Sequence, residues 1–389
     1  MEKAMVRCAD VLDVRDGTHD SPQYVTDGYP LITSKNIKDG EIDFENVNYI
    51  KEEDFNKINM RSKVDVGDIL MPMIGTIGNP VVVNTDKPFA IKNVALFKFT
   101  NQCDFDSKFV YYVLKSPLVV NQLNANKRGG TQAFVSLGNI RDLKIPNIPL
   151  ELQKKVVNVL DKAKEIIDKR KEQIETCDEL IKSQFIEMFG DLTQYTFRPF
   201  SECTKFIDYR GKTPQLSDDG TIRMINAKSV GKGFFKHVDE FITEETYNEW
   251  MKRGFPIEGD VLFVTEGHTF GNVCTIPANI GKFAMGQRVI TIQGNKELLN
   301  NTYLATYMQT DVFKKEIEKY KTGSSAQGIR SKELIKIEVP IPQVSLQNQF
   351  AEFVQQVDKL KFEMEKSLEE LENNFNALMQ KAFKGELFN

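Results

Sequence analysis

The sequence is poor in the residues and motifs on which most enzymes depend. Among 389 residues there is one tryptophan, and there are only three histidines. It contains no GxxxxGK[ST] phosphate loop, no GxGxxG opening a helix, no HExxH zinc motif and no GxSxG nucleophile elbow. None of the many acidic residues is paired in a way that singles out an acid and a base. These absences predict a chain that performs no catalysis itself.

Cysteine patterns and long apolar runs are also missing. The five cysteines are scattered, with no CxxC and no paired Cys/His spacing, which argues against a zinc site and against a disulfide framework. No apolar run approaches the roughly 18 residues that a membrane span needs. Residues 1–10 carry charges and lack the apolar core of a signal peptide. We therefore expect a cytoplasmic protein with no metal site and no membrane partner.

What the sequence does contain is an internal repeat at a spacing of 192–194 residues. Gly67–Leu70 (GDIL) returns as Gly259–Leu262 (GDVL), and Leu152-Gln153 returns as Leu346-Gln347. Ile145-Pro146 and Val339-Pro340 match in the same order. Several matches in one order, at nearly one offset, indicate a tandem duplication.

The first part of each repeat, about 150 residues, has mixed signals. Short strand-like runs at residues 68–73 and 94–99 lie between Gly, Pro and Asn turn clusters, and residues 107–124 are helical in character. The second copy has the same pattern at residues 260–265, 288–292 and 301–320. Each first part therefore predicts a compact α/β globule.

The second part of each repeat predicts one long helix with an apolar seam. Apolar residues step by three or four, without proline or interior glycine, until Gly190 in one copy and Gly385 in the other. A helix of 35–40 residues would be roughly 55–60 Å long, longer than its own globule, so the nearest partner is its copy. The alternative is that each helix packs on its own globule.

Arg170 and Lys361 interrupt the seam, and they either pair with acids across it or face a partner protein. The predicted seam residues are Val156, Leu160, Ile167, Ile174, Ile181, Phe350, Val354, Leu368, Leu371 and Phe375.

Polar loops occupy matching positions in the two globules. The net charge is only −4, from 51 basic and 55 acidic residues, so any basic surface has to arise from clustering in space. Lys92-Asn93 corresponds to Gln287-Arg288, and residues 127–132 correspond to residues 321–327. Such side chains can bind base edges and phosphates, although ordinary polar turns share their composition. Because the loops stay polar while their residues differ, they fit two modules of one shape that read two different sequences.

These features together resemble one family, the specificity subunits of type I DNA restriction–modification systems. The resemblance covers the whole chain. Its motifs are DGTHDSP at Asp16–Pro22, PLITSKNIKDGEIDF at Pro30–Phe44, GDILMPMIGTIG at Gly67–Gly78, IRDLKIPNIPLELQ at Ile140–Gln153 and LIKIEVPIPQVSLQ at Leu334–Gln347. The lead into the second helix lacks the counterpart of Pro149-Leu150 and departs from the pattern.

The resemblance implies an α+β fold made by tandem duplication. Target-recognition domains would occupy residues 1–150 and 191–340, and long spacer helices residues 151–190 and 341–389. The two helices would form an antiparallel coiled coil with pseudo-two-fold symmetry.

The resemblance also implies a non-catalytic subunit in host defence that binds a bipartite double-stranded DNA target, with one half-site per recognition domain. Two modification (methyltransferase) subunits would methylate adenine, and restriction/translocase subunits would join them. S-adenosylmethionine, ATP and Mg would be held by those partners, and this chain would bind no cofactor. The alternatives are a duplicated coiled-coil scaffold without DNA specificity, a fused enzyme fragment that lacks a visible motif, and a modification-only system.

Loop position and side-chain chemistry give candidate DNA contacts in both domains. In the first domain they are Thr18, His19, Ser34, Lys35, Asn36, Thr76, Lys92, Arg128 and Gln132. In the second they are Arg210, Lys212, Thr213, Asn226, Lys228, His268, Arg288, Ser325 and Gln327.

Overall fold

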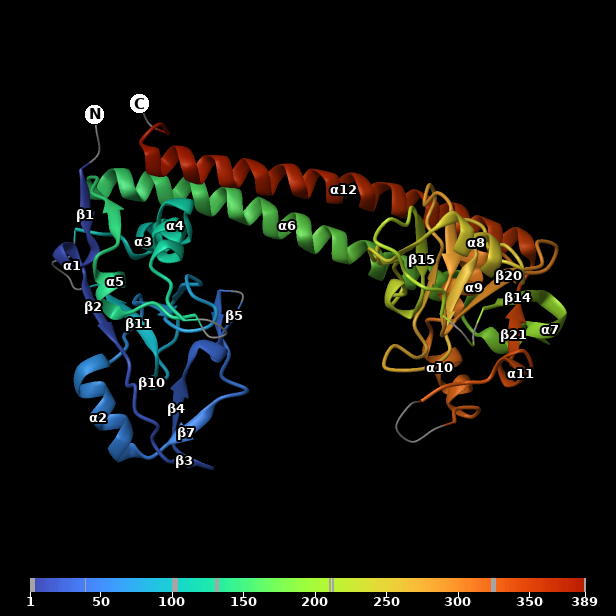
Figure 1. Cartoon of the computed structure of the whole chain (residues 1–389), viewed down its shortest axis with the longest axis horizontal. Coiled ribbons are helices and arrows are strands. Elements are labelled where there is room, and N and C mark those ends of the chain that lie inside the picture. The colour runs from blue at the N-terminus through green and yellow to red at the C-terminus, as the bar shows by residue number, and fades with distance from the viewer. Residues whose placement is uncertain are drawn as a thin grey trace. The chain divides into compact units, whose positions relative to one another are not determined.

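The chain divides into two units that each combine a globule with parts of both long helices. The computed structural model describes residues 4–38, 40–99, 104–129, 133–209, 211, 213–322 and 327–387. Unit 1 comprises Met1–Lys171 and Lys366–Asn389, and unit 2 comprises Glu172–Glu365. Unit 1 thus holds the beginning of α6 (Leu150–Phe189) and the end of α12 (Val344–Lys384), and unit 2 holds the other halves (Figure 1).

An antiparallel four-stranded sheet forms the centre of each globule. Its two middle strands, β8 and β11 in unit 1, are apolar runs whose residues are buried almost throughout, as expected for strands covered on both faces. The order β2-β11-β8-β9 in unit 1 returns as β14-β20-β17-β18 in unit 2. The strands are β2 (Asp13–Asp16), β8 (Ile69–Pro72), β9 (Val81–Val82), β11 (Val94–Lys98), β14 (Thr204–Asp208), β17 (Val261–Val264), β18 (Val273–Thr275) and β20 (Val289–Gly294).

A second sheet in each unit contains one parallel pair, β4 with β10 in unit 1 and β15 with β19 in unit 2. A two-stranded ribbon near the helix start, β1 with β12 and β13 with β21, is also duplicated. The strands of these sheets and ribbons are β1 (Met5–Arg7), β3 (Tyr24–Val25), β4 (Tyr29–Ile32), β7 (Asn48–Ile50), β10 (Ala90–Ile91), β12 (Lys144–Pro146), β13 (Thr196–Pro199), β15 (Ile222–Ile225), β16 (Phe241–Ile242), β19 (Phe283–Met285) and β21 (Glu338–Ile341). In unit 1, β5 (Ile37–Lys38) and β6 (Glu41–Ile42) pair in a separate two-stranded sheet.

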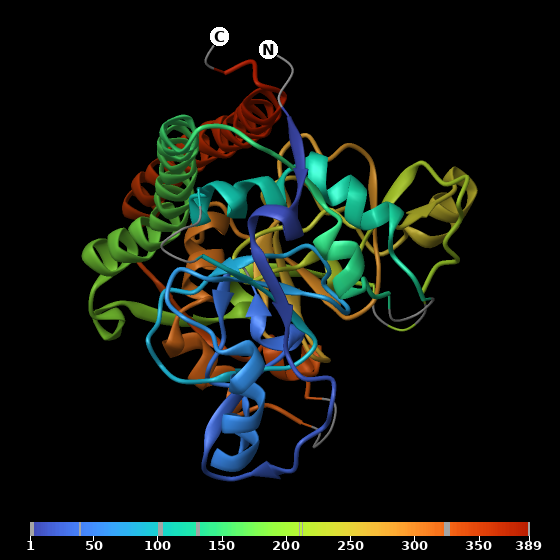
Figure 2. The ribbon, with the colours of Figure 1, turned by 90° about the vertical axis from the view of Figure 1, so that its left-hand side faces the viewer.

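Both helical stretches expected after the central strands are broken into two helices. In unit 1 the break falls at Ser116, whose backbone is extended (ψ 153°) because Pro117 follows it and disfavours the helical conformation. In unit 2 the break precedes Asp311, and the Thr310 side chain caps the new helix. The shorter helices are α1 (Cys8–Val11), α2 (Glu52–Ser62), α3 (Ser107–Lys115), α4 (Pro117–Ala125), α5 (Leu137–Arg141), α7 (Phe200–Cys203), α8 (Glu244–Trp250), α9 (Asn301–Tyr307), α10 (Asp311–Glu318) and α11 (Ser331–Leu334), with 3₁₀ turns η1 (Ser34–Asn36), η2 (Leu192–Gln194) and η3 (Ala227–Ser229). In unit 1, α2 and β3 lie at the end of the globule far from α6 (Figures 1 and 2).

The long helices have 40 and 41 residues, in agreement with the seam pattern. Gly190 (φ 46°) and Gly385 (φ 88°) end them in the left-handed conformation that glycine tolerates. The start of each is fixed to its globule by a buried glutamine. Gln153 accepts from the Asp106 amide (2.9 Å) and donates to the carbonyls of Asp104 (2.9 Å) and Ile148 (2.8 Å).

The second glutamine, Gln347, repeats this set of bonds in unit 2. It accepts from the Asn300 amide (2.8 Å) and donates to the carbonyls of Leu298 (2.9 Å) and Pro342 (2.8 Å). The repeated Leu-Gln motif is therefore a structural clamp between helix and globule.

The repeated Gly-Asp motif is also structural. Asp68 is buried at 2% exposure and accepts from the Asp65 amide (2.8 Å) and from Lys98 Nζ (2.7 Å). Asp260 accepts from the Ile257 amide (2.8 Å) and from Gln293 (2.7 Å). Asp68 thus connects the turn before β8 to β11, and Asp260 connects the turn before β17 to β20.

Contacts inside each unit show that the two long helices run antiparallel. In unit 1, Lys171 pairs with Glu372 (2.8 Å), and Phe383 packs edge-on against Phe109 of the globule (5.8 Å between ring centroids). In unit 2, Lys361 pairs with Asp178 (2.6 Å). Later residues of α6 thus meet earlier residues of α12, and Lys361 has an acid across the seam.

The seam residues pack against globule as well as helix. In unit 2, Phe350 contacts Phe185 and Phe189 of α6, and Phe185 and Phe189 also contact Tyr303 of α9. Each globule therefore shares one core with both helix segments of its unit. The structure buries Val156, Leu160, Ile167, Phe350 and Val354 and leaves Ile174, Ile181, Leu368, Leu371 and Phe375 half-buried.

Candidate nucleic-acid interface

The turn after β2 brings the first group of predicted contacts together in unit 1. The Thr18 amide donates to the Ile91 carbonyl (3.0 Å), and the Asn93 amide donates to the Thr18 carbonyl (3.1 Å). A Cβ on Gly17 would lie 2.1 Å from the Ile91 carbonyl oxygen, so only glycine allows this approach. Thr18 and His19 are therefore held beside Lys92.

Polar contacts orient the side chains of this turn. The carboxylate of Asp16, buried at 6% exposure, accepts from Arg61 of α2 and lies 2.9 Å from His19 Nε2. His19 Nδ1 lies 2.8 Å from Asn93 Oδ1, and Lys92 Nζ donates to Ser21 (2.6 Å). The exposed imidazole is thus fixed between two partners, which lowers the entropy lost on binding a ligand.

A second loop lies against the first. Asn93 accepts from the Met73 amide (3.3 Å), and residues 73–75 bond to residues 133–135, so the segment that carries Thr76 adjoins the turn. Arg128 and Phe134 exchange backbone hydrogen bonds (3.0 and 2.9 Å), which brings Arg128 to the same edge. Both Thr76 and Arg128 are exposed.

Residues 33–36 form a third loop next to Lys92, whose amide donates to the Ile32 carbonyl (2.9 Å). Lys35 is exposed, whereas Asn36 is buried at 4% exposure. The Asn36 amide accepts from Thr33 and donates to the carbonyls of Asp43 (3.4 Å) and Asn46 (3.0 Å). Asn36 therefore holds the loop together, while Lys35 projects from it.

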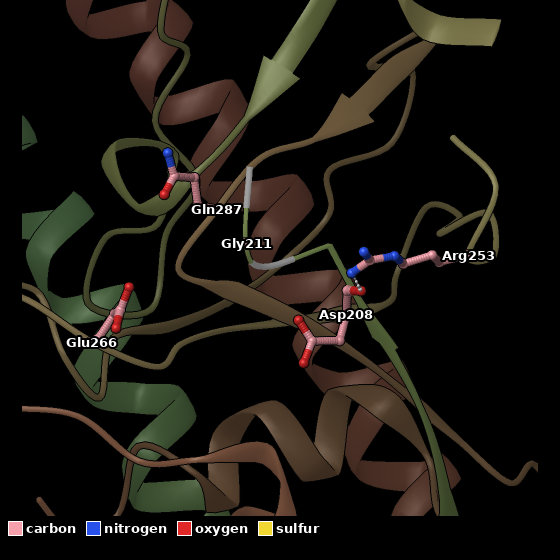
Figure 3. Close-up of a pocket in the computed structure, with 5 residues that line it drawn as sticks. All are labelled: Asp208, Gly211, Arg253, Glu266 and Gln287. Atoms are coloured by element: carbon pink, nitrogen blue, oxygen red, sulfur yellow. Dashed lines mark hydrogen bonds between the residues drawn. The ribbon is translucent and has the colours of Figure 1, made fainter. Parts of the chain in front are cut away.

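Unit 2 places a hollow of about 550 Å³ at the equivalent turn. Its lining residues are Asp208, Gly211, Arg253, Glu266 and Gln287 (Figure 3). Arg253 donates to the Asp208 carbonyl (3.2 Å), and Ser331 donates to the Asp208 carboxylate (2.6 Å). Amide, guanidinium and carboxylate groups on one open hollow can pair with the donors and acceptors of base edges.

Arg288 takes the place that Asn93 has in unit 1, and both have left-handed backbones (φ 65° and 54°). The Arg288 carbonyl accepts from the Thr265 amide (2.9 Å), and its guanidinium lies 3.4 Å from Glu266. A non-glycine residue in this conformation costs of the order of 1 kcal/mol. The bond to Thr265 holds it there and directs the arginine into the loop cluster.

Asn226 and Lys228 occupy the third loop of unit 2 and share one carboxylate. Asn226 donates to Glu240 (2.6 Å), and Lys228 forms an ion pair with the same group. The hydrogen bond from Lys228, followed by that from Asn226, lowers the pKa of Glu240, which keeps it charged. The Gly286 amide donates to the Ile225 carbonyl (2.6 Å), so this loop adjoins Gln287.

Comparison with known proteins agrees with this duplicated arrangement. The family model described as the type I restriction modification DNA specificity domain matches residues 2–176 and again residues 204–373. The chain belongs to this family. It is a specificity subunit with two target-recognition domains in tandem.

Relatives of the whole chain have similar descriptions. A putative type I restriction enzyme MjaX specificity subunit of Methanocaldococcus jannaschii is 23% identical over 97% of this chain and 92% of its own length. The type I restriction enzyme MjaVIII specificity subunit of the same organism is 22% identical over 72% of this chain and 70% of its own.

Solved structures share the fold. The specificity subunit of M. genitalium matches with a TM-score of 0.51 and 17% identity, covering 98% of this chain and 96% of that one. A chain from work on complex assembly and conformational transition of the type I system matches with a TM-score of 0.62 and 18% identity, covering 99% and 98%.

The specificity subunit thus brings most of its predicted contacts into one loop cluster per recognition domain. In the second domain, His268 follows Gly267, whose amide donates to the Gln327 carbonyl (3.0 Å), and Thr213 is exposed beyond Gly211. The predicted contacts Gln132, Arg210, Lys212 and Ser325 lie outside the described residues.

Several residues of the cluster escaped the sequence-based prediction. Asp16 with Arg61 and Asp208 with Arg253 hold the central turns, and both pairs are 45 residues apart. An aspartate and an arginine 45 residues apart occur in both copies, although the residues around them differ. This repeated spacing could have identified the two pairs from the sequence. Glu266 carried no signal, since its place in the hollow depends on packing.

The described residues of the specificity subunit contain no group of three or more His, Cys, Asp and Glu side chains suited to a metal ion. The described cysteines Cys8, Cys177, Cys203 and Cys274 are free and buried. Burial raises the pKa of Cys8 to about 12, which disfavours its reactive thiolate. No helix within the ranges covered by the structure is long and apolar enough to cross a membrane.

Proposed function

We propose that this chain is the non-catalytic specificity subunit of a complex that methylates adenine within a bipartite DNA target. Each recognition domain reads one half-site through its loop cluster. Two modification subunits supply S-adenosylmethionine chemistry, and restriction subunits that use ATP and Mg join the complex. The chain itself holds no cofactor.

One observation carries the proposal: the same loop scaffold presents different side chains in the two domains. Asn93 of one domain corresponds to Arg288 of the other: both have left-handed backbones, and their carbonyls accept from the matching amides of Met73 and Thr265. The residues that precede them, Lys92 and Gln287, also differ. Arginine and lysine bind guanine edges, and asparagine and glutamine bind adenine edges. Two half-sites of different sequence require recognition loops that share a backbone structure but carry different base-contacting side chains.

The long helices supply a spacing element for this function. A continuous helix of 40 residues extends about 60 Å at 1.5 Å per residue. Since each helix belongs to both units, its length sets how far apart the two readers are along the DNA. The chain therefore specifies half-site bases with its loops and half-site separation with its helices.

Methylome sequencing tests the proposal. The chain is produced with its neighbouring modification subunit in a host that lacks DNA methylation. Methylated adenines in one bipartite motif are expected. Methylation of a short continuous motif would contradict the two-reader arrangement. Absence of methylation from a soluble, assembled pair would favour a scaffold protein without DNA specificity.

A further inference from the structure

A second hollow, of about 310 Å³, lies in the second recognition domain beside the loop cluster. It is lined by Lys319, Tyr320, Lys321, Thr322, Arg330, Lys332 and Glu333. Four of these residues are cationic and one is acidic. The acid, Glu333, is itself paired with Lys336 (3.2 Å), which lies outside the lining. The hollow is therefore strongly positive in a chain whose net charge is negative.

The cations of the hollow differ in their partners. Lys319 pairs with Glu316, and Lys321 pairs with Glu318 (2.9 Å). Within the described part of the chain, the exposed side chains of Arg330 and Lys332 have no ion pair and no side-chain hydrogen bond. Two cations without a carboxylate partner can bind an anion without first breaking an ion pair.

Backbone hydrogen bonds connect this hollow to the loops that line the 550 Å³ hollow of the same domain. Gly328 is bridged to Glu266 on one side and to Thr322 on the other. The Ile329 amide donates to the Thr265 carbonyl (2.9 Å), which places Arg330 one residue beyond the cluster. A DNA duplex read at Glu266 and Arg288 would bring its phosphates within reach of these cations.

Among the described residues of the first recognition domain, the two positions that match Arg330 and Lys332 carry no cation. Phe134 and Val135 make the bonds that Gly328 and Ile329 make, so Ser136 and Gly138 correspond to Arg330 and Lys332. Ser136 donates to Asn139 (2.5 Å). The two domains therefore share a scaffold but differ here in charge.

We propose that the 310 Å³ hollow is a phosphate site for the DNA backbone beside the half-site of the second domain, with Arg330 and Lys332 as its phosphate ligands. Arginine binds phosphate oxygens through a planar fork and lysine as a point charge. Phosphate contacts position the duplex without selecting its sequence. The proposal rests on the proposed function and adds to it two phosphate contacts that the matching positions of the first domain do not provide.

The test is the salt dependence of DNA binding by the complex of this chain with its modification subunit. The variant Arg330→Gln/Lys332→Gln removes two cations from the hollow. The control Lys205→Gln/Lys296→Gln removes two exposed lysines near the opposite end of the β14–β20 pair. The probe is a duplex that carries the methylated motif. A second variant, Arg330→Lys/Lys332→Arg, exchanges the residues and keeps both charges.

Each phosphate contact contributes about 0.9 to the slope of log Kobs against log salt. The double glutamine variant is expected to make that negative slope shallower by about 1.8, so that its affinity falls about tenfold less than that of the wild type between 50 and 200 mM salt. The control and the charge-retaining variant keep the wild-type slope, and all variants methylate the same motif.

Equal slopes for the double glutamine variant and the control, with a wild-type complex that binds its motif specifically, would overturn this proposal alone. A change in the methylated motif would also overturn it, because the hollow would then read bases. A wild-type complex without any sequence preference would overturn the proposed function, and this proposal with it.

Discussion

Arg61 of α2 donates to the buried carboxylate of Asp16 across 45 residues of chain and so holds the turn after β2. The same turn contains Gly17 and Thr18, whose amides bond to Val94 (3.0 Å) and Ile91 (3.0 Å). In the second domain Arg253 donates to the carbonyl of Asp208, which also lies 45 residues away in the sequence. Arg61 in the last turn of α2 and Arg253 in the loop after α8 thus support the central turn of their own domains.

The variant Arg61→Gln leaves the Asp16 carboxylate without its cation. Leaving a buried hydrogen-bonding group unsatisfied costs about 1–3 kcal/mol, and more when the group is charged, so the turn should lose at least that much stability. Amide hydrogen exchange at Gly17 and Thr18 is expected to become correspondingly faster. Lys57→Gln, an exposed change on the same helix, is the control. Equal protection of these amides in both variants would show that the ion pair does not hold the turn.

The sequence predicts the domain organisation and the long helices well. The duplication appears as matches at a nearly constant spacing, and helical periodicity depends only on neighbouring residues. The tandem α/β globules and the long helices are confirmed. The breaks at Ser116 and before Asp311 were not predicted, since the apolar pattern continues across them. In unit 1, proline at residue 117 was the available sign.

The site is harder to predict, because exposure is set by distant contacts. Asn36 and Lys35 are neighbours of similar polarity, yet Asn36 bonds inside its loop and Lys35 is exposed. The carbonyls of the left-handed residues Asn93 and Arg288 accept from the amides of Met73 and Thr265, which are 20 and 23 residues away in the chain. Loop composition alone therefore identifies the cluster but not each side chain's part in it.

Phe350 provides a test of the shared core in unit 2. Its ring packs edge-on against both Phe185 and Phe189 of α6 and is fully buried. Phe350→Ala should lower the free energy of unfolding by about 3–5 kcal/mol, as measured by urea denaturation. Phe362→Ala, on the same helix at 63% exposure, should change it by less than about 0.5 kcal/mol. Similar values for both variants would contradict the packing of α12 against α6 at Phe350.

Glu240 predicts a pH dependence for the third loop of the second domain. Its pKa in the folded chain lies below the ordinary 4.5, mainly because Lys228 bonds to it. A lowered carboxyl pKa contributes stability that is present above the ordinary pKa and is lost as the pH falls through the folded value. The difference in melting temperature between wild type and Glu240→Gln should therefore shrink as the pH falls from 7 to 3. A difference that is constant over this range would show that the charge of Glu240 does not stabilise the loop.

The spacing role of the helices predicts the result of a matched insertion. Seven residues are added to α6 after Lys171 and seven to α12 after Glu365, which keeps both seams in phase to within about 20°. Each helix lengthens by about 10 Å, which corresponds to about three base pairs at 3.4 Å per pair. Methylome sequencing should then find the same two half-sites with a spacer about three base pairs longer, because the loops that read the bases are unchanged.

An insertion of seven residues in α6 alone is the control, and it should impair assembly because the two helices no longer match. An unchanged spacer in the matched variant would show that half-site separation is set elsewhere, by the globules or the modification subunits.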